Sequence, residues 1–411
     1  MFPPNAPPLP DLLTEMWQPR IWAFVVALLV SLLATPLFRW IALRKDIWDQ
    51  PDQAVKIHAH PVPYLGGCAI WLAWTVGFLF ALVLTRLTDP SVVWDWHYLL
   101  PRLALVLGGA VAFVTGLLDD LFDIQHWQKL LGQSLAAVVL LAGGIRWMAY
   151  PNLTWLPFLD LAEGSLFVVM ICVAIHFVVV LGATNATNLL DGLDGLCSGV
   201  TVIISAGFLL LATALVAWAD PVFGAPGVAI RYEYTQPIMS MAFALAGATI
   251  GFLPYNFNPA RIFMGDAGSV FIGYVLAAMM IMFASRHGIV KWFIGALFIF
   301  GVPIFDTGVA VIRRVLNHRP IMRPDRSHVY NQLVDRLGLS VRWTVAILYG
   351  MSILFAAAGL LVLYLPGTRA LLIYLGAGAA ILVVVWRLGF LRMTPEEIAA
   401  ADRSLAQKRR M

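Results

Sequence analysis

The chain has 411 residues, of which 61% are hydrophobic and only 12% are charged. Soluble domains are typically about 45–50% apolar and about 25% charged, so this composition excludes an ordinary soluble protein and indicates one embedded in a bilayer. A net charge of +4 gives no indication of nucleic-acid binding. The three cysteines, Cys68, Cys172 and Cys197, lack the spacing of a zinc site or a disulfide framework.

Eleven apolar stretches approach the length of about 20 residues that a membrane-spanning helix needs. They cover residues 21–38, 65–85, 101–118, 130–145, 165–182, 199–218, 236–253, 270–284, 292–312, 343–365 and 369–387. We therefore expect an all-α polytopic membrane protein with about 11 transmembrane helices. Charged residues at the ends of these stretches, such as Lys129, are expected to reach the membrane interface.

The chain is expected to divide into three parts. Residues 1–20 contain prolines and two acids but no basic n-region, so the first apolar stretch is interpreted as a membrane anchor rather than a cleaved signal. This N-terminal segment is expected to be extracytoplasmic. A transmembrane domain follows over residues 21–390, and residues 391–411 form a basic cytoplasmic tail.

The distribution of lysine and arginine predicts the orientation. The loops after odd-numbered stretches, together with the C-terminal tail, hold 19 of these residues, and the opposite side holds 8. Because cytoplasmic loops carry the excess of positive charge, the odd loops are expected to be cytoplasmic. The N-terminus is then outside and the C-terminus inside.

Five polar motifs follow odd-numbered stretches, so all are expected on the cytoplasmic face. They are Lys56–Pro61, Asp119–Asp123, Asn185–Gly195, Asn256–Ser269 and the arginine-rich stretch 313–336. The opposite loops carry proline, glycine and aromatic residues without a comparable cluster. This one-sided arrangement predicts a single active face that opens to the cytosol.

Asp119, Asp120 and Asp123 close the third stretch. Adjacent carboxylates repel one another and are tolerated where a cation lies nearby. Mg²⁺ prefers carboxylate oxygens and substrate phosphates, so this run is interpreted as a diphosphate–Mg²⁺ site. The alternative is that these are interfacial charges, which the C-terminal end of a helix disfavours for anions.

Asn185, Asn188, Asp191 and Asp194 recur at three-residue spacing in the fifth loop. On a helix this spacing places the side chains near one face, and a polar cluster of this density beside membrane spans indicates a functional site. The alternative is a turn rich in Asn, Asp and Gly. Asp266, at the start of the eighth stretch, is interpreted as a metal ligand or as the N-cap of its own helix.

The ninth loop combines basic residues with two histidines. Its charges are expected to set topology and to attract anionic lipids, and Arg326 and His328 in addition to contact a phosphate or nucleotide. Asp306 precedes this loop within a span and is expected to pair with Arg313 or Arg314, or to contact substrate. His176 is interpreted as a satisfied core histidine.

Together these motifs resemble the polyprenyl-phosphate N-acetylhexosamine-1-phosphate transferases. The resemblance covers residues 40–340 and depends on 188–195, 263–269, 56–67 and the Asp119–Asp120 pair. Pro320 and the run Arg323–His328 resemble the N-acetylglucosamine-1-phosphate branch of this superfamily. That branch usually continues with a further histidine pair, whereas Val329, Tyr330 and Asn331 follow here.

The resemblance implies a bacterial inner-membrane enzyme that transfers a sugar-1-phosphate from a UDP-sugar to a polyprenyl phosphate and so starts a cell-envelope glycan. UDP-GlcNAc is the first candidate donor, and phospho-MurNAc-pentapeptide transfer is the alternative. Mg²⁺, or alternatively Mn²⁺, is the implied cofactor, and membrane lipids and a second copy of the chain are implied partners. A transporter is the remote alternative, which would place acids near mid-span.

Roles for single residues follow from the same resemblance, as hypotheses. Asp266 holds the metal, with Asp191 as a second ligand or orienting group. Asp119 orients the lipid phosphate or accepts its proton, and Asp120 supports the metal site. Contacts to the nucleotide or its phosphates are assigned to Lys56, Asn188, Asp194 and Asn256. Arg326 and His328 steady the leaving phosphate or the sugar.

Overall fold

A computed structural model of the chain describes residues 9–49, 61–89, 92–145, 166–217, 228–284, 290–319, 328–361, 365 and 367–393. These residues form thirteen helices and one two-stranded hairpin. The helices are α1 (Leu9–Arg44), α2 (Gly66–Thr88), α3 (Trp96–Phe122), α4 (His126–Ala142), α5 (Leu166–Leu190), α6 (Leu196–Ala217), α7 (Val228–Asn256), α8 (Gly265–Ala284), α9 (Val290–Ile299), α10 (Gly301–Leu316), α11 (Val329–Asp335), α12 (Val341–Leu361) and α13 (Gly367–Arg387). The strands are β1 (Trp48–Asp49) and β2 (Val62–Pro63), paired antiparallel.

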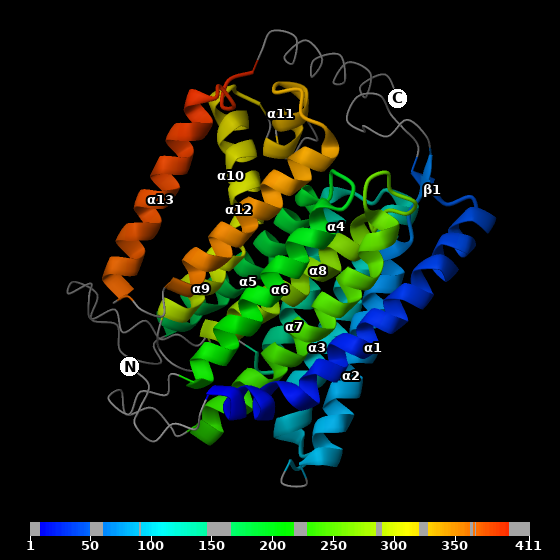
Figure 1. The fold of residues 1–411 in the computed structure, drawn as a ribbon, viewed down its shortest axis with the longest axis vertical. Helices are drawn as coiled ribbons and strands as arrows, with labels where there is room; N and C mark the ends of the chain where they lie inside the picture. Colours follow the sequence, from blue (N-terminus) through cyan, green and yellow to red (C-terminus); the bar gives the residue numbers. More distant parts are fainter. Residues whose placement is uncertain are drawn as a thin grey trace.

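The helices form one bundle in which α8 is the central element. Of the residues in its most apolar 18-residue stretch, 94% are buried inside the protein. The helix packs against α2, α3, α5, α7 and α9. Figure 1 shows α1 along one flank of the bundle and α13 along the other, with α6, α7 and α8 between them. Large apolar side chains such as Leu33, Val178 and Leu354 are at least 70% exposed, as expected of a surface that faces lipid.

The chain is therefore an all-α polytopic membrane protein, as the sequence predicts. Eight helices in the described part are long and apolar enough to cross a bilayer. Ten of the eleven predicted stretches each coincide with one helix, but α4 has 17 residues, or about 26 Å, which is less than the thickness of the hydrocarbon core. The count of eleven, the orientation and the division into three parts stay predictions. Residues 1–8 and 394–411 lie outside the described residues.

The stretch 292–312 is not one continuous helix, contrary to the prediction. It is divided into α9 and α10, which meet at an angle of 71°. Gly301 and Pro303 open α10, and proline is tolerated in a first turn because it removes no helical hydrogen bond there. A Cβ at Gly301 would come within 2.4 Å of the Phe355 ring, so the bend also brings the backbone close to α12.

Close backbone contacts fix α8 against its neighbours. A Cβ at Gly116 of α3 would lie 2.2 Å from the carbonyl oxygen of Asp266, and one at Gly67 of α2 would lie 2.2 Å from the amide nitrogen of Gly268. The amides of Gly66 and Gly67 donate to the carbonyls of Phe263 and Met264, both at 2.9 Å. The start of α8 is thus held by α2 and α3 together.

We expect Gly116→Ala to lower both stability and activity. The added methyl has to displace the Asp266 carbonyl, and overpacking of this kind costs about 1–3 kcal/mol of unfolding free energy. Thermal unfolding of the detergent-solubilised protein measures the effect. Gly182→Ala in α5 is the matched control, because nothing lies within 4 Å of a Cβ there. Equal melting temperatures for the two variants would contradict this account of the packing.

Candidate active site

Asp119 and Asp120 lie in the last turn of α3, and they have different partners. The two carboxylate oxygens of Asp120 accept hydrogen bonds from the backbone N–H groups of Asp266 (2.8 Å) and Ala267 (2.9 Å). Asp120 therefore caps the first turn of α8 from another helix, where the positive end of the helix dipole favours an anion. Asp266 does not need to cap its own helix, and its side chain is directed to other partners.

Lys129, in the first turn of α4, lies among the acids. Its Nζ donates to Asp119 Oδ2 at 2.8 Å, to Asn188 Oδ1 at 3.1 Å and to Asp266 Oδ2. The side chain is only 11% exposed. The expected position of Lys129 at the membrane interface stays a prediction, and the structure adds a role that the sequence did not indicate: the ammonium compensates the charge of two carboxylates contributed by α3 and α8.

Asn188 completes this cluster from the last turns of α5. Its Nδ2 donates to Asp266 Oδ1 at 2.7 Å and to Ser269 Oγ at 3.0 Å. Ser269 is fully buried and also donates to the carbonyl of Gly265. The structure thus brings together Asp119, Asp120, Asn188 and Asp266, all predicted from sequence, and it adds Lys129 and Ser269. We call these six residues the acid cluster.

Asp191 lies in the turn between α5 and α6, next to the acid cluster. Burial, together with the negative charges of Asp266 and Asp120, raises the pKa of the Asp191 carboxyl well above its usual range. A carboxyl that is hard to ionise because of its neighbours gains most from an added cation. Proximity of Asp191 to Asp266 is what the predicted metal role requires.

Asp194 and Asn256 use their polar atoms within the protein. Asp194 Oδ2 accepts from the amide of Ala260 at 3.0 Å and from the side chain of Asn258 at 2.9 Å. Asn256 is buried; its Oδ1 accepts from the Gly195 amide and Ser198, and its Nδ2 donates to the Ile262 carbonyl. Both side chains therefore join the 191–195 turn to the loop before α8.

His328, the N-cap residue of α11, is paired with Asp306 of α10. His328 Nδ1 lies 2.7 Å from Asp306 Oδ2, and the Val329 amide donates to Asp306 Oδ1 at 2.7 Å. Both side chains are almost completely buried. The partner of Asp306 is thus His328 and not the arginine expected from helical spacing. His176 is fully buried and contacts the Ala137 carbonyl, as expected of a core histidine.

Lys56 and Arg326 lie outside the described residues, so their predicted roles stay predictions. The same holds for the rest of the segment 320–327. The described end of the Lys56–Gly67 motif, residues 61–67, does contact the acid cluster, since Tyr64 donates to the Asp120 carbonyl at 2.7 Å. Tyr64 also pairs with Phe263 in a short parallel bridge.

Comparison with known proteins identifies the family of this chain. Residues 102–284 match the sequence model of glycosyl transferase family 4, and this range contains the acid cluster. A Bacillus subtilis protein named a probable undecaprenyl-phosphate N-acetylglucosaminyl 1-phosphate transferase is 32% identical, over 82% of this chain and 83% of its own length. The chain belongs to glycosyl transferase family 4.

Two further relatives show the breadth of family 4. A decaprenyl-phosphate N-acetylglucosaminephosphotransferase of Mycolicibacterium smegmatis is 28% identical over 90% of this chain and 89% of its own. A phospho-N-acetylmuramoyl-pentapeptide-transferase of Corynebacterium jeikeium is 30% identical over 80% of this chain and 94% of its own. Among these three relatives the highest identity, 32%, belongs to the one named for N-acetylglucosaminyl 1-phosphate transfer, and the longest alignment, 387 residues, belongs to the other one named for N-acetylglucosamine, so the branch predicted from the motifs is confirmed.

The donor atoms at this family-4 site suit a hard cation. In the described residues no three His, Cys, Asp or Glu side chains are arranged to hold a metal as they stand. The Lys129 ammonium lies between the carboxylates of Asp119 and Asp266, because it contacts both of them. The oxygens of Asp266, Asp191, Asp119 and Asn188 are nevertheless the type that Mg²⁺ binds, and the acids outnumber the single lysine.

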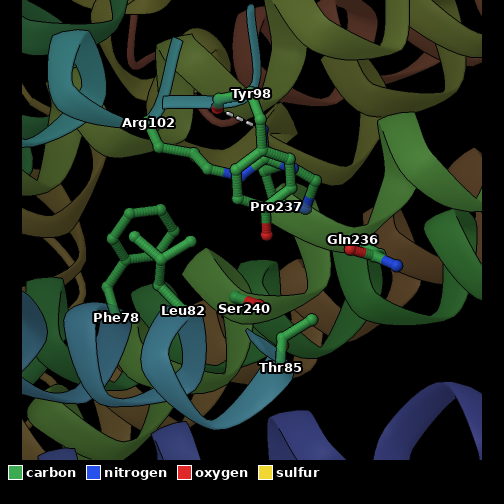
Figure 2. Close-up of a pocket in the computed structure, with 8 residues that line it drawn as sticks. All are labelled: Phe78, Leu82, Thr85, Tyr98, Arg102, Gln236, Pro237 and Ser240. Atoms are coloured by element: carbon green, nitrogen blue, oxygen red, sulfur yellow. Dashed lines mark hydrogen bonds between the residues drawn. The ribbon is translucent and has the colours of Figure 1, made fainter. Parts of the chain in front are cut away.

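One small pocket lies at the opposite end of the bundle from the acid cluster. Figure 2 shows Arg102 reaching back to Tyr98 beside Gln236, Pro237 and Ser240. Tyr98 and Asp119 are both on α3, 21 residues apart, which is about 32 Å along a helix. The pocket volume of about 10 Å³ accommodates one water molecule, so the pocket is not a substrate site.

Proposed function

We propose that the chain transfers N-acetylglucosamine 1-phosphate from UDP-N-acetylglucosamine to a polyprenyl phosphate. An oxygen of the lipid phosphate attacks the β-phosphorus, the bond from that phosphorus to the oxygen bridging to the α-phosphate breaks, and UMP leaves with that oxygen. The product is a lipid-linked diphospho-sugar. The names of the Bacillus subtilis and Mycolicibacterium smegmatis relatives support the donor and acceptor.

The observation that carries this proposal is the meeting of Asp119, Asn188 and Asp266 around Lys129. Three helices and a lysine from a fourth bring these groups to one end of a membrane bundle. Phosphoryl transfer depends on positioning and on stabilising charge on phosphoryl oxygens, so such a site matches its needs. A transporter would instead place its acids near mid-span.

We further propose that Mg²⁺, or Mn²⁺ in its place, is held by Asp266 and Asp191. When bound, the cation would neutralise charge on the diphosphate of the donor. Lys129 keeps Asp119 and Asp266 at fixed separation, and Asn188 orients Asp266 through its other oxygen. Asp120 holds the backbone of Asp266 and so places its side chain.

Supporting roles are proposed for the remaining residues, those of Lys56 and Arg326 on the family resemblance alone. Asp119 orients the lipid phosphate at the membrane edge, where no strong base is needed because that phosphate is ionised near pH 7. His328, with Nδ1 fixed by Asp306, presents Nε2 to the leaving phosphate or the sugar. Asp194 and Asn256 support the turn that carries Asp191. Lys56 and Arg326 are proposed to contact the phosphates.

A two-step route through a phosphorylated aspartate is the alternative path for the same overall reaction. It requires UMP to exchange with UDP-N-acetylglucosamine when no lipid acceptor is present. Incubation of purified protein with labelled UMP and the donor alone tests this, and the absence of exchange favours direct transfer.

The excess of Lys and Arg in the odd loops supports an inner-membrane location with the site facing the cytoplasm. A homodimer stays a prediction.

We expect purified protein to release UMP from UDP-N-acetylglucosamine only when undecaprenyl phosphate and Mg²⁺ are both present. The assay should include UDP-N-acetylgalactosamine and UDP-MurNAc-pentapeptide as competing donors, with EDTA as the metal control. Release that is fastest from the pentapeptide donor would reassign the chain to muramoyl transfer. Release from none of the three donors would contradict the proposed function.

A further inference from the structure

Tyr330 of α11 joins two parts of the site that are distant in sequence. Its side chain is buried, and its hydroxyl donates to the carbonyl of Leu189 at 3.0 Å. A Cβ added at Gly192 would lie 2.1 Å from that hydroxyl. The tyrosine therefore fits against the end of α5 and the turn that follows it, where a side chain at position 192 would exclude it.

The same ring contacts His328. The two rings are stacked, with centroids 5.4 Å apart and planes 13° from parallel. His328 is in turn fixed by Asp306, which also accepts from the amide of Val329. The imidazole is thus held at one nitrogen by a carboxylate and on one face by a phenol ring, which leaves it little rotational freedom.

Leu189 lies directly between functional neighbours. Asn188 precedes it and contacts Asp266 and Lys129, and Asp191 follows two residues later. A shift of the Leu189 carbonyl therefore moves the amide that orients Asp266. Contacts run without a gap from Asp306 through His328 and Tyr330 to the backbone beside Asn188.

We propose that Tyr330 is a positioning residue that holds His328 and the Asn188–Asp191 segment in the relative positions that the transfer step needs. The inference rests on the proposed function, because both of the parts it joins are assigned to the donor phosphates. Tyr330 acts through its neighbours, so its loss lowers turnover more than it weakens binding of the donor.

Tyr349 of α12 provides a matched control. Its hydroxyl donates to the carbonyl of Gly195 at 2.5 Å, at the far end of the same turn. Gly199 is packed against it as Gly192 is packed against Tyr330. Tyr330→Phe and Tyr349→Phe thus each remove one hydroxyl–carbonyl bond, the first at the end of α5 and the second at Gly195, but only Tyr330 stacks on His328.

The experiment compares kcat, the KM for UDP-N-acetylglucosamine and the melting temperature of Tyr330→Phe, Tyr330→Leu and Tyr349→Phe. We expect Tyr330→Phe to lower kcat about tenfold with KM within about twofold, since small displacements of reacting groups act on turnover. Tyr330→Leu also removes the stacked ring and should lower kcat about a hundredfold. Tyr349→Phe should lower the melting temperature as much as Tyr330→Phe but keep kcat within about twofold.

Equal kcat values for the two phenylalanine variants would overturn the proposal, as would a Tyr330→Phe variant that changes only KM or only the melting temperature. Because Tyr330→Phe keeps the ring, it tests the proposal even where Tyr330→Leu fails to fold. An unmodified protein that releases no UMP from any donor would reject the proposed function instead, so the two failures are distinguishable.

Discussion

Asp266→Asn is expected to abolish UMP release while the protein still inserts into the membrane. The Asp266 side chain accepts from Asn188 Nδ2 at one oxygen and from Lys129 Nζ at the other. The substitution keeps the size of the side chain, removes its charge and places an amide N–H against a donor. We expect UMP release to fall by at least about a thousandfold, because metal coordination and charge compensation are lost together.

Asp123→Asn is the control for this variant. Asp123 is exposed, ends α3 and has a left-handed backbone with φ of 47°, a conformation that asparagine also adopts readily. The sequence pattern includes Asp123 in the predicted Mg²⁺ site, but the structure leaves its side chain exposed. The substitution keeps the backbone hydrogen bond from Asp123 to the Asp119 carbonyl, so activity should stay within about twofold. If Asp266→Asn kept full activity, or if Asp123→Asn were equally inactive, the metal assignment would be wrong.

The helices could be predicted from the sequence because each depends on local properties. A long apolar stretch has to form its backbone hydrogen bonds internally once it lies in lipid, and a helix does this within one segment. The prediction was wrong at 292–312, where Gly301 and Pro303 lie inside an apolar stretch. Their effect depends on how α9 and α10 pack against α12, which hydropathy does not report.

The members of the acid cluster were found because acids and amides beside membrane spans are rare and need a reason. Their pairing was not found, since it depends on contacts between helices. Asp120 caps α8 from α3, 146 residues away, and Lys129 contacts Asp266 across 137 residues. The signal that could have identified Lys129 is a lone lysine six residues after the last of three aspartates, because an uncompensated acidic run needs a cation.

The Asp306–His328 pair was missed for a similar reason. Helical spacing favoured Arg313 or Arg314 as the partner of Asp306, because residues on one helix are the only neighbours that sequence makes visible. The partner comes instead from a different element, 22 residues along the chain. The sequence does show that Tyr330 stands where the family branch usually has a further histidine pair. The contact of Tyr330 with Leu189, however, follows only from the position of α11 against the end of α5.

Lys129→Met is the second variant with a large expected effect. Methionine has a similar length but no charge, so Asp119 and Asp266 would face each other without the ammonium that now contacts both. Breaking a buried ion pair on one side is strongly destabilising because it leaves an uncompensated charge. We expect kcat/KM for UDP-N-acetylglucosamine to fall by about a hundredfold, since the two carboxylates lose their fixed separation.

The response of Lys129→Met to divalent cations separates an electrostatic role from simple packing. With the ammonium gone, added Mg²⁺ can compensate the acids in its place, so the melting temperature of this variant should rise with Mg²⁺ more than that of the unmodified protein. Lys129→Arg keeps the charge on a larger, planar group and should retain more activity than Lys129→Met. A Lys129→Met protein with full activity, or with a melting temperature as insensitive to Mg²⁺ as a variant outside the cluster, would show that Lys129 only fills space between α3, α4 and α8.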